Sequence, residues 1–104
     1  MKIEVPELTA GPMHIDISAH RATANGADLQ LTPNEFGLLK VLMSRPGRVY
    51  ARSDLVARVQ GYDFEGYDRT IDSHIKNLRK KISRHLPGRK IIQTVYGVGY
   101  TFKP

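Results

Sequence analysis

Residues 68–84, DRTIDSHIKNLRKKISR, decide the fold of this chain. Their apolar residues are spaced four, three and four positions apart, which predicts one narrow stripe on an α-helix, formed by Ile71, Ile75, Leu78 and Ile82. Asp68 is expected to cap the helix, and Leu86-Pro87-Gly88 is expected to end it. The stretch therefore predicts a long amphipathic helix with one buried face.

The face opposite the stripe is basic. It is formed by Arg69, Ser73, Lys76, Asn77, Lys80 and Arg84, with Thr70, His74 and Lys81 on one flank and Asp72 and Arg79 on the other. Such a face suits the DNA major groove, because cations bind phosphates or guanine and an Asn side chain can pair with adenine through two hydrogen bonds. A solvated helix surface explains the same pattern equally well, so the helix alone does not decide the function.

The neighbouring segments favour a winged helix-turn-helix. Upstream, Thr32-Pro33-Asn34-Glu35 combines a capping box with proline at the first helical position, and it predicts a helix that ends near Ser44. A shorter helix is expected over residues 52–59, with Leu55, Val56 and Val59 facing inward; Ser53 could cap it, or Ala51 could occupy the cap position and leave a weak start. Residues 91–95 and 100–102 flank a glycine-containing turn and predict a terminal β-hairpin. Two helices followed by a hairpin are typical of this motif, in which the hairpin is the wing.

The first 31 residues alternate short apolar runs with turn signals. Strands are expected over 8–10, 13–17, 20–24 and 28–31, with Asn25-Gly26 as the hairpin turn between the last two. Together, the segments predict a single α+β domain over residues 1–104: an N-terminal antiparallel sheet, three helices and a C-terminal β-hairpin wing.

Charge is distributed unevenly along the chain. The formal net charge is +6, but residues 1–44 carry −2 and residues 45–104 carry +8. A polyanion is the simplest partner for the basic part, because neutralising phosphates releases counterions. The chain has no cysteine, which excludes disulfides and thiolate chemistry. It has neither an apolar run of membrane-spanning length nor a signal peptide, so we expect a cytoplasmic protein without membrane contact.

Four blocks resemble the C-terminal winged-helix effector domain of the OmpR/PhoB family of bacterial response regulators. They are LTPNEFGLL at 31–39, PGRVY at 46–50, residues 68–82 of the basic helix, and IQTVYGVGY at 92–100. They follow the family's order and cover nearly the whole chain. Within the family, residues 68–81 and 95–100 are most similar to the BaeR-like branch. The resemblance implies sequence-specific binding of double-stranded DNA as the output of a two-component system that controls transcription.

The resemblance also implies roles for individual residues. Base-reading positions correspond to Thr70, Ser73, Lys76 and Asn77. Positions near the DNA backbone correspond to Arg48, Arg52, Arg69, His74, Arg79 and Lys80, and wing contacts correspond to Thr94, Tyr96 and Gly97. The loop at 61–67 corresponds to the one that contacts RNA polymerase in activators of the family, which implicates Tyr62, Asp63 and Glu65. Tandem half-sites are the expected DNA target.

The sequence departs from the family pattern at three positions. Asn77 stands where several relatives carry a base-reading Arg, which favours adenine over guanine. Tyr96 replaces a frequent Arg at the wing tip, which weakens the expectation of an Arg in the minor groove. Ala51 stands where a capping Ser is usual. Nothing in the sequence resembles the family's receiver domain, so the chain corresponds to the effector half of a two-domain regulator.

Other classes of function fit the sequence less well. The four His residues are scattered, and no HExxH, GxSxG or glycine-rich phosphate loop occurs, so we expect neither an enzyme nor a metal site nor a cofactor. The sequence shows no aromatic platform of the RRM type, so RNA is a less favoured partner than DNA. The main alternative is a protein-interaction module that binds an acidic partner through the basic helix or the 61–67 loop. Salt-sensitive binding to duplex DNA would distinguish the two.

Overall fold

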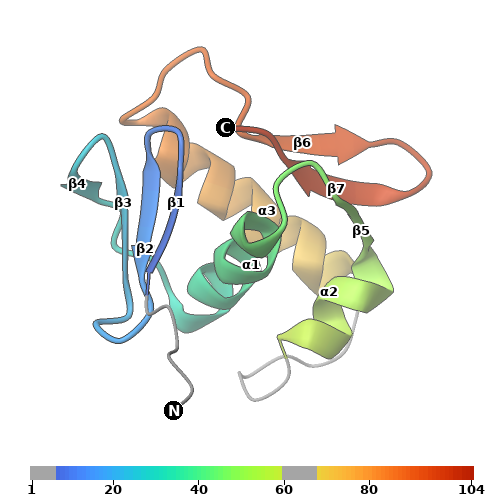
Figure 1. The fold of residues 1–104 in the computed structure, drawn as a ribbon. Helices are drawn as coiled ribbons and strands as arrows, with labels where there is room; N and C mark the ends of the chain where they lie inside the picture. The colour runs from blue at the N-terminus through green and yellow to red at the C-terminus, as the bar shows by residue number, and fades with distance from the viewer. Residues whose placement is uncertain (1–6, 60–67) are drawn as a thin grey trace.

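The computed structural model describes residues 7–59 and 68–104, and for residues 68–70 it describes the backbone only. In this part of the chain three helices lie at the centre, with a sheet at each end (Figure 1). The N-terminal sheet contains β1 Glu7–Ala10, β2 Met13–Asp16, β3 Arg21–Ala24 and β4 Ala27–Asp28, in that order and antiparallel throughout. The predicted α+β class and N-terminal sheet are confirmed.

The turn between β3 and β4 follows the prediction. Asn25 has φ +51° and Gly26 has φ +82°, the left-handed pair that a two-residue hairpin turn requires. The next strand is shorter than predicted. β4 ends at Asp28, because Gln30 also lies in the left-handed region (φ +53°) and its backbone N–H donates to the Asp28 carboxylate at 2.8 Å. The expectation of a strand as far as residue 31 was therefore wrong.

Helix α1, Pro33–Ser44, begins with the predicted capping box. The Thr32 hydroxyl accepts a hydrogen bond from the Glu35 backbone N–H at 3.3 Å, and the Glu35 carboxylate accepts one from the Thr32 backbone N–H at 2.9 Å. Glu35 is only 2% exposed, and its carboxylate also pairs with the Lys81 ammonium at 2.6 Å. A buried charge is tolerable when it is paired and hydrogen-bonded, so this ion pair joins the start of α1 to the basic helix.

Helix α2, Arg52–Arg58, follows directly on a strand that the sequence analysis did not predict, β5 Val49–Ala51. Ala51 occupies the N-cap position and makes no side-chain cap hydrogen bond, so of the two starts considered for α2 the structure has the weak one. Leu55 and Val59 are buried as predicted, whereas Val56 is only half-buried.

Helix α3, Asp68–Ser83, packs against α1 and α2. All four residues of the predicted stripe, Ile71, Ile75, Leu78 and Ile82, are at most 2% exposed. They belong to a single core that also contains side chains from both sheets. Asp68 was expected to cap the helix from the position before its first residue, but it is itself the first residue of α3. The prediction of a helix with one buried face is confirmed.

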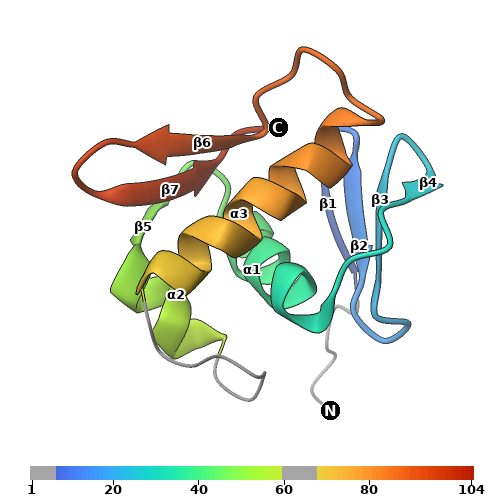
Figure 2. The same ribbon diagram turned by 180° about the vertical axis from the view of Figure 1, so that it is seen from behind.

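The wing is formed by β6 Ile92–Val95 and β7 Gly99–Phe102. β7 lies in the middle of a three-stranded sheet of order β5-β7-β6, so the hairpin is anchored to the strand before α2. From behind, α3 runs between the N-terminal sheet and the wing with its outer face uncovered (Figure 2). No helix in the described ranges is long and apolar enough to cross a membrane.

Candidate nucleic-acid interface

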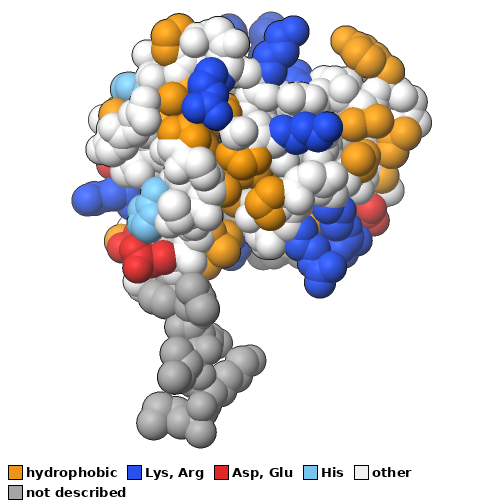
Figure 3. Space-filling view, turned by 45° about the horizontal axis from the view of Figure 1, so that its top comes forward, with side chains coloured by type: hydrophobic (Ala, Val, Ile, Leu, Met, Phe, Trp, Pro, Cys, Tyr) orange, Lys and Arg blue, Asp and Glu red, His pale blue; other side chains and the backbone are white. Residues whose placement is uncertain are grey.

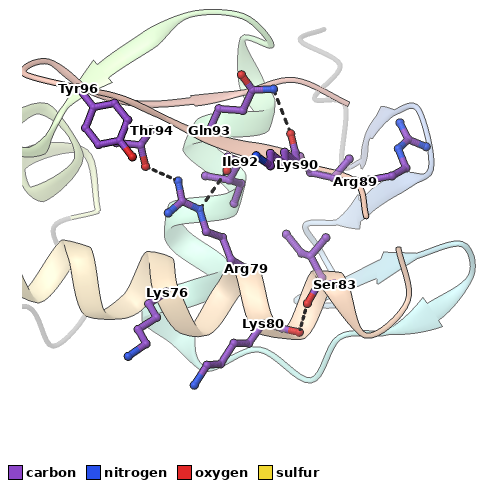
Figure 4. A pocket seen from close by; sticks show the side chains of 12 residues that line it. Lys76, Arg79, Lys80, Ser83, Arg89, Lys90, Ile92, Gln93, Thr94 and Tyr96 are labelled. Carbon is purple, nitrogen blue, oxygen red and sulfur yellow. Dashed lines mark hydrogen bonds between the residues drawn. The ribbon is translucent and has the colours of Figure 1, made fainter. Parts of the chain in front are cut away.

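A row of polar side chains lies on the uncovered face of α3. It consists of Ser73, Lys76, Asn77 and Lys80, and all four are exposed. Lys76 and Lys80 extend away from the wing (Figure 4). Within residues 7–59 and 71–104, none of the four side chains pairs with an acidic group. The row can therefore meet an external partner without first breaking an internal ion pair.

The flank of α3 that faces the wing differs, because its charged side chains are engaged within the molecule. The Arg79 guanidinium donates to the Ile92 carbonyl at 3.0 Å and to the Thr94 hydroxyl at 2.6 Å. The Asp72 carboxylate accepts hydrogen bonds from Arg52 at 2.7 Å and from the Tyr100 hydroxyl at 2.5 Å. The two flanking residues thus contact the wing and α2.

Between α3 and the wing lies an open groove of about 720 Å³ (Figure 4). Five cationic side chains line it: Lys76, Arg79, Lys80, Arg89 and Lys90. The acidic residues of the described chain contribute none of its lining. Its charge fits a polyanionic backbone, because closely spaced phosphates release bound cations when protein charges replace them.

The contacts of Asp72 shift two pKa values. Partial burial raises the pKa of Asp72. Hydrogen bonds from Tyr100 and Arg52 and the positive charges of Arg52 and Arg79 lower it, and together they outweigh the effect of burial, so the net shift of the pKa is downward. Burial, followed by the hydrogen bond to Asp72 and its negative charge, raises the pKa of Tyr100. At neutral pH the pair therefore consists of an ionised carboxylate and a protonated phenol, as the hydrogen bond requires.

The contribution of Asp72 to the free energy of unfolding should be lost at acidic pH. Because its pKa is lower in the folded than in the unfolded chain, the contribution is present above about pH 4 and is lost as pH falls through the folded pKa. The Asp72 side chain is 42% exposed, so water screens the pair and we expect only about 0.5 kcal/mol. Urea unfolding measured at about pH 4.5 and at about pH 2.5 should show that the free energy of unfolding falls less between the two pH values for Asp72→Asn than for wild type. Equal losses would contradict this assignment.

The wing tip is exposed and largely apolar. Tyr96 is 91% exposed and Val98 is 51% exposed, on either side of Gly97, whose φ of +78° closes the turn. Apolar side chains cover the end of the molecule that the wing forms, at the right of Figure 3. Thr94, further down the wing, is half-buried because its hydroxyl faces Arg79. The tip thus presents an exposed aromatic ring, at the position where Tyr96 departs from the family pattern.

The remaining predicted site residues have different surroundings. Arg48 is exposed, and its guanidinium lies 4.8 Å above the Tyr50 ring. Arg52 is paired with Asp72, and His74 lies beside Asn34 at 3.4 Å. The side chains of Arg69 and Thr70 fall outside the described residues, and so do Tyr62, Asp63 and Glu65 of the predicted polymerase-contact loop. No group of three His or acidic residues in the described chain is arranged to hold a metal ion.

Two parts of the candidate interface were not predicted from the sequence: the strand β5 and the role of Tyr100. Tyr100 was assigned only to a wing strand, yet it is 5% exposed, its hydroxyl donates to Asp72 of α3, and the guanidinium of Arg52 on α2 lies 5.7 Å from the centre of its ring. Asp72 and Arg79 were both placed on one flank of the helix, which was the only available signal that this flank meets another element. The partner on the other side could not be identified without the tertiary structure.

A basic helix with an uncovered face, beside a hairpin wing and packed on two shorter helices, defines a winged helix-turn-helix domain. Residues 26–102 match the family described as "Transcriptional regulatory protein, C terminal". The chain belongs to this family, the effector domains of OmpR/PhoB-type response regulators. The assignment to the BaeR-like branch stays a prediction.

Individual relatives agree with this assignment. ResD of Bacillus subtilis is 46% identical over 92 residues, which are 88% of this chain and 38% of ResD. The DNA-binding domain of CpxR from E. coli superposes with a TM-score of 0.78 at 32% identity, over 95% of this chain and 97% of that one. The Klebsiella pneumoniae RstA DNA-binding domain, solved in complex with the RstA box, gives 0.78 at 28% identity, over 94% and 97%. The chain thus spans about two fifths of the length of its curated relatives.

Proposed function

We propose that this domain binds double-stranded DNA in a sequence-specific manner and controls transcription as the output domain of a two-component response regulator. The observation that carries the proposal is the row of Ser73, Lys76, Asn77 and Lys80 on the uncovered face of α3, beside a groove lined by cations. An α-helix fits the major groove of B-form DNA, and a wing beside it can reach the adjacent backbone or minor groove. The domain acts by binding, without catalysis, metal or cofactor.

The side chains on α3 divide into two kinds of contact. Ser73 and Asn77 are small or planar, so we assign them to bases, together with Thr70 and Lys76. Lys80 and Arg48 are exposed cations, and we assign them to phosphates, together with Arg69 and His74. On the wing, we assign Thr94, Tyr96 and Gly97 to DNA contacts, as the family resemblance implies. Arg52 already pairs with Asp72, so a phosphate contact from Arg52 would have to share its guanidinium.

The whole protein gives this domain its context. Family membership supports a receiver domain in the full-length protein, whose phosphorylation would act on the effector half through dimerisation or release. Two copies would then bind tandem half-sites, and the 61–67 loop would contact RNA polymerase. These activities belong in the cytoplasm, where the chromosome and polymerase of a bacterium are found.

Selection from a library of random duplexes, followed by footprinting, tests the proposal and yields the preferred site. Enrichment of a defined sequence supports it. Failure to enrich any duplex, together with binding to an acidic protein, would favour the protein-interaction module instead.

Asn77→Ala should relax base preference at one position of the selected site. The amide can form two hydrogen bonds with adenine, so its loss should reduce discrimination at that base pair about tenfold and leave other positions unchanged. Affinities measured on single-base variants of the site would show this. Lys80→Ala serves as the matched control, because loss of a phosphate contact weakens all sequences about equally. Uniform weakening by Asn77→Ala would sink the base-reading role.

A further inference from the structure

Two side chains on the wing-facing flank of α3, Asp72 and Arg79, reach the wing at separate points. They are seven residues apart, which is about two helical turns, so they lie on the same flank. A groove of about 720 Å³ opens between α3 and the wing beside the core that they share, and Arg79 makes hydrogen bonds across it. Figure 4 shows Arg79 reaching across toward the wing, whereas Lys76 and Lys80 extend away from it.

Arg79 uses the shape of its guanidinium as well as its charge. One nitrogen, Nε, donates to the Ile92 carbonyl at 3.0 Å, and Nη2 donates to the Thr94 hydroxyl at 2.6 Å. Both acceptors belong to β6, two residues apart on one strand. A planar fork can satisfy two fixed acceptors at once, whereas the single ammonium of a lysine cannot reproduce this geometry.

The other wing strand, β7, is held through Tyr100. The Tyr100 hydroxyl donates to Asp72 at 2.5 Å, and Arg52 donates to the same carboxylate at 2.7 Å. The guanidinium of Arg79 lies 5.3 Å from the centre of the Tyr100 ring, and that of Arg52 lies 5.7 Å from it. Cations at these distances from an aromatic ring are attracted to it. Each strand of the wing is therefore tied to α3 by a side chain of that helix.

We infer that Arg79 is a positioning residue, which sets the wing against the recognition helix, and that Tyr100 and Asp72 form the second point of the same attachment. This inference rests on the proposed function, and it replaces the phosphate contact that the family resemblance implied for Arg79. DNA that contacts α3 and the wing together requires a fixed distance between them. Loss of the attachment therefore weakens binding even though no DNA contact is removed.

The test compares Arg79→Lys with Arg79→Gln on the selected duplex at several salt concentrations. If Arg79 positions the wing, Arg79→Lys keeps the charge but loses the fork, so both variants should bind about tenfold more weakly than wild type. The slope of log affinity against log salt should stay at its wild-type value in both. Removal of a phosphate contact would instead reduce that slope by about 0.9 in Arg79→Gln only. Arg21→Lys is the matched control, because Arg21 is exposed on β3 of the N-terminal sheet, at the opposite end of the molecule from the wing (Figure 1), and it should bind like wild type.

Tyr100→Phe provides a second variant, on the other strand of the wing. Tyr100 is only 5% exposed, and the change keeps its ring while removing the hydrogen bond from its hydroxyl to Asp72. We expect about threefold weaker binding with an unchanged salt slope. Binding by Tyr100→Phe equal to that of wild type would overturn the role of the second attachment point.

A measurement without DNA separates this inference from the proposed function. Backbone residual dipolar couplings report the orientation of β6 and β7 relative to α3. Arg79→Lys should change that orientation, and Arg21→Lys should not. An unchanged orientation in Arg79→Lys, or wild-type DNA affinity for that variant, would overturn the positioning role. Failure of the wild-type domain to bind any duplex would instead reject the proposed function and leave the dipolar-coupling result to decide the attachment.

Discussion

Raising the salt concentration from about 50 to about 200 mM should weaken binding of this domain to its selected duplex about 500-fold. The estimate assumes that about five phosphates are neutralised, which gives a slope of about −4.5 for log affinity against log salt. Exposed cations are available for this on α3, at its C-terminal end and in the segment that leads to the wing: Lys76, Lys80, Arg84, Arg89 and Lys90. Fluorescence anisotropy of a labelled duplex across this range measures the slope directly.

Two charge-removing variants make the salt experiment specific to one face. Lys80→Gln should reduce the magnitude of the slope by about 0.9, because one fewer counterion is released. Arg21→Gln should leave it unchanged, because β3 belongs to the N-terminal sheet, at the opposite end of the molecule from the wing (Figures 1 and 2). Equal effects of the two substitutions would show that the charge acts diffusely and that α3 is not the binding face. A slope near zero in the wild-type domain would exclude duplex DNA as the partner.

Gly99→Ala should lower the free energy of unfolding by about 3 kcal/mol, a large part of the stability of a domain of this size. Gly99 pairs with Ala51 where β7 meets β5, and it is buried. A Cβ atom at Gly99 would overlap the carbonyl oxygen of Tyr50 and crowd the Ala51 backbone. Backbone atoms cannot rotate aside like a side chain, so the two strands have to separate. Urea denaturation should show a lower midpoint with little change in slope.

Gly97→Ala is the control for this prediction. Gly97 lies in the wing turn at φ +78°, and a Cβ atom there would meet nothing within 4 Å. Its cost should therefore be only the strain of a left-handed alanine, about 1 kcal/mol. If both variants lose the same stability, conformational strain rather than the close approach of β5 and β7 limits these positions. A wing that keeps its β5 pairing in Gly99→Ala, seen as unchanged amide exchange at Val49 and Ala51, would contradict the expected separation.

Local patterns were sufficient for most of the elements. The spacing of Ile71, Ile75, Leu78 and Ile82 defines a helix stripe whatever lies beneath it, and all four are buried. The capping box at Thr32 and Glu35 and the turn at Asn25-Gly26 depend only on residues within the same turn of chain. The exposed row on α3 followed from the same helical geometry, which is why the candidate interface could be located before the structure was known.

Contacts between distant segments were not available from the sequence. β5 is three residues long, and what makes it a strand is pairing with β7, about fifty residues further along the chain. Gly99 resembled a turn glycine and is instead required where two backbones approach closely. The family resemblance implied that Arg79 binds a phosphate, yet in the structure its guanidinium donates to acceptors on the wing.

A basic helix with one buried and one polar face, followed by a hairpin, could be predicted from the sequence alone, because helical and hairpin periodicities are properties of neighbouring residues. The use of the charged flank of that helix depends instead on contacts between segments far apart in the chain. From the sequence, Asp72 and Arg79 are only an acidic and a basic residue two helical turns apart. They became attachment points for the wing because folding brought Arg52, Thr94 and Tyr100 within hydrogen-bonding distance of them.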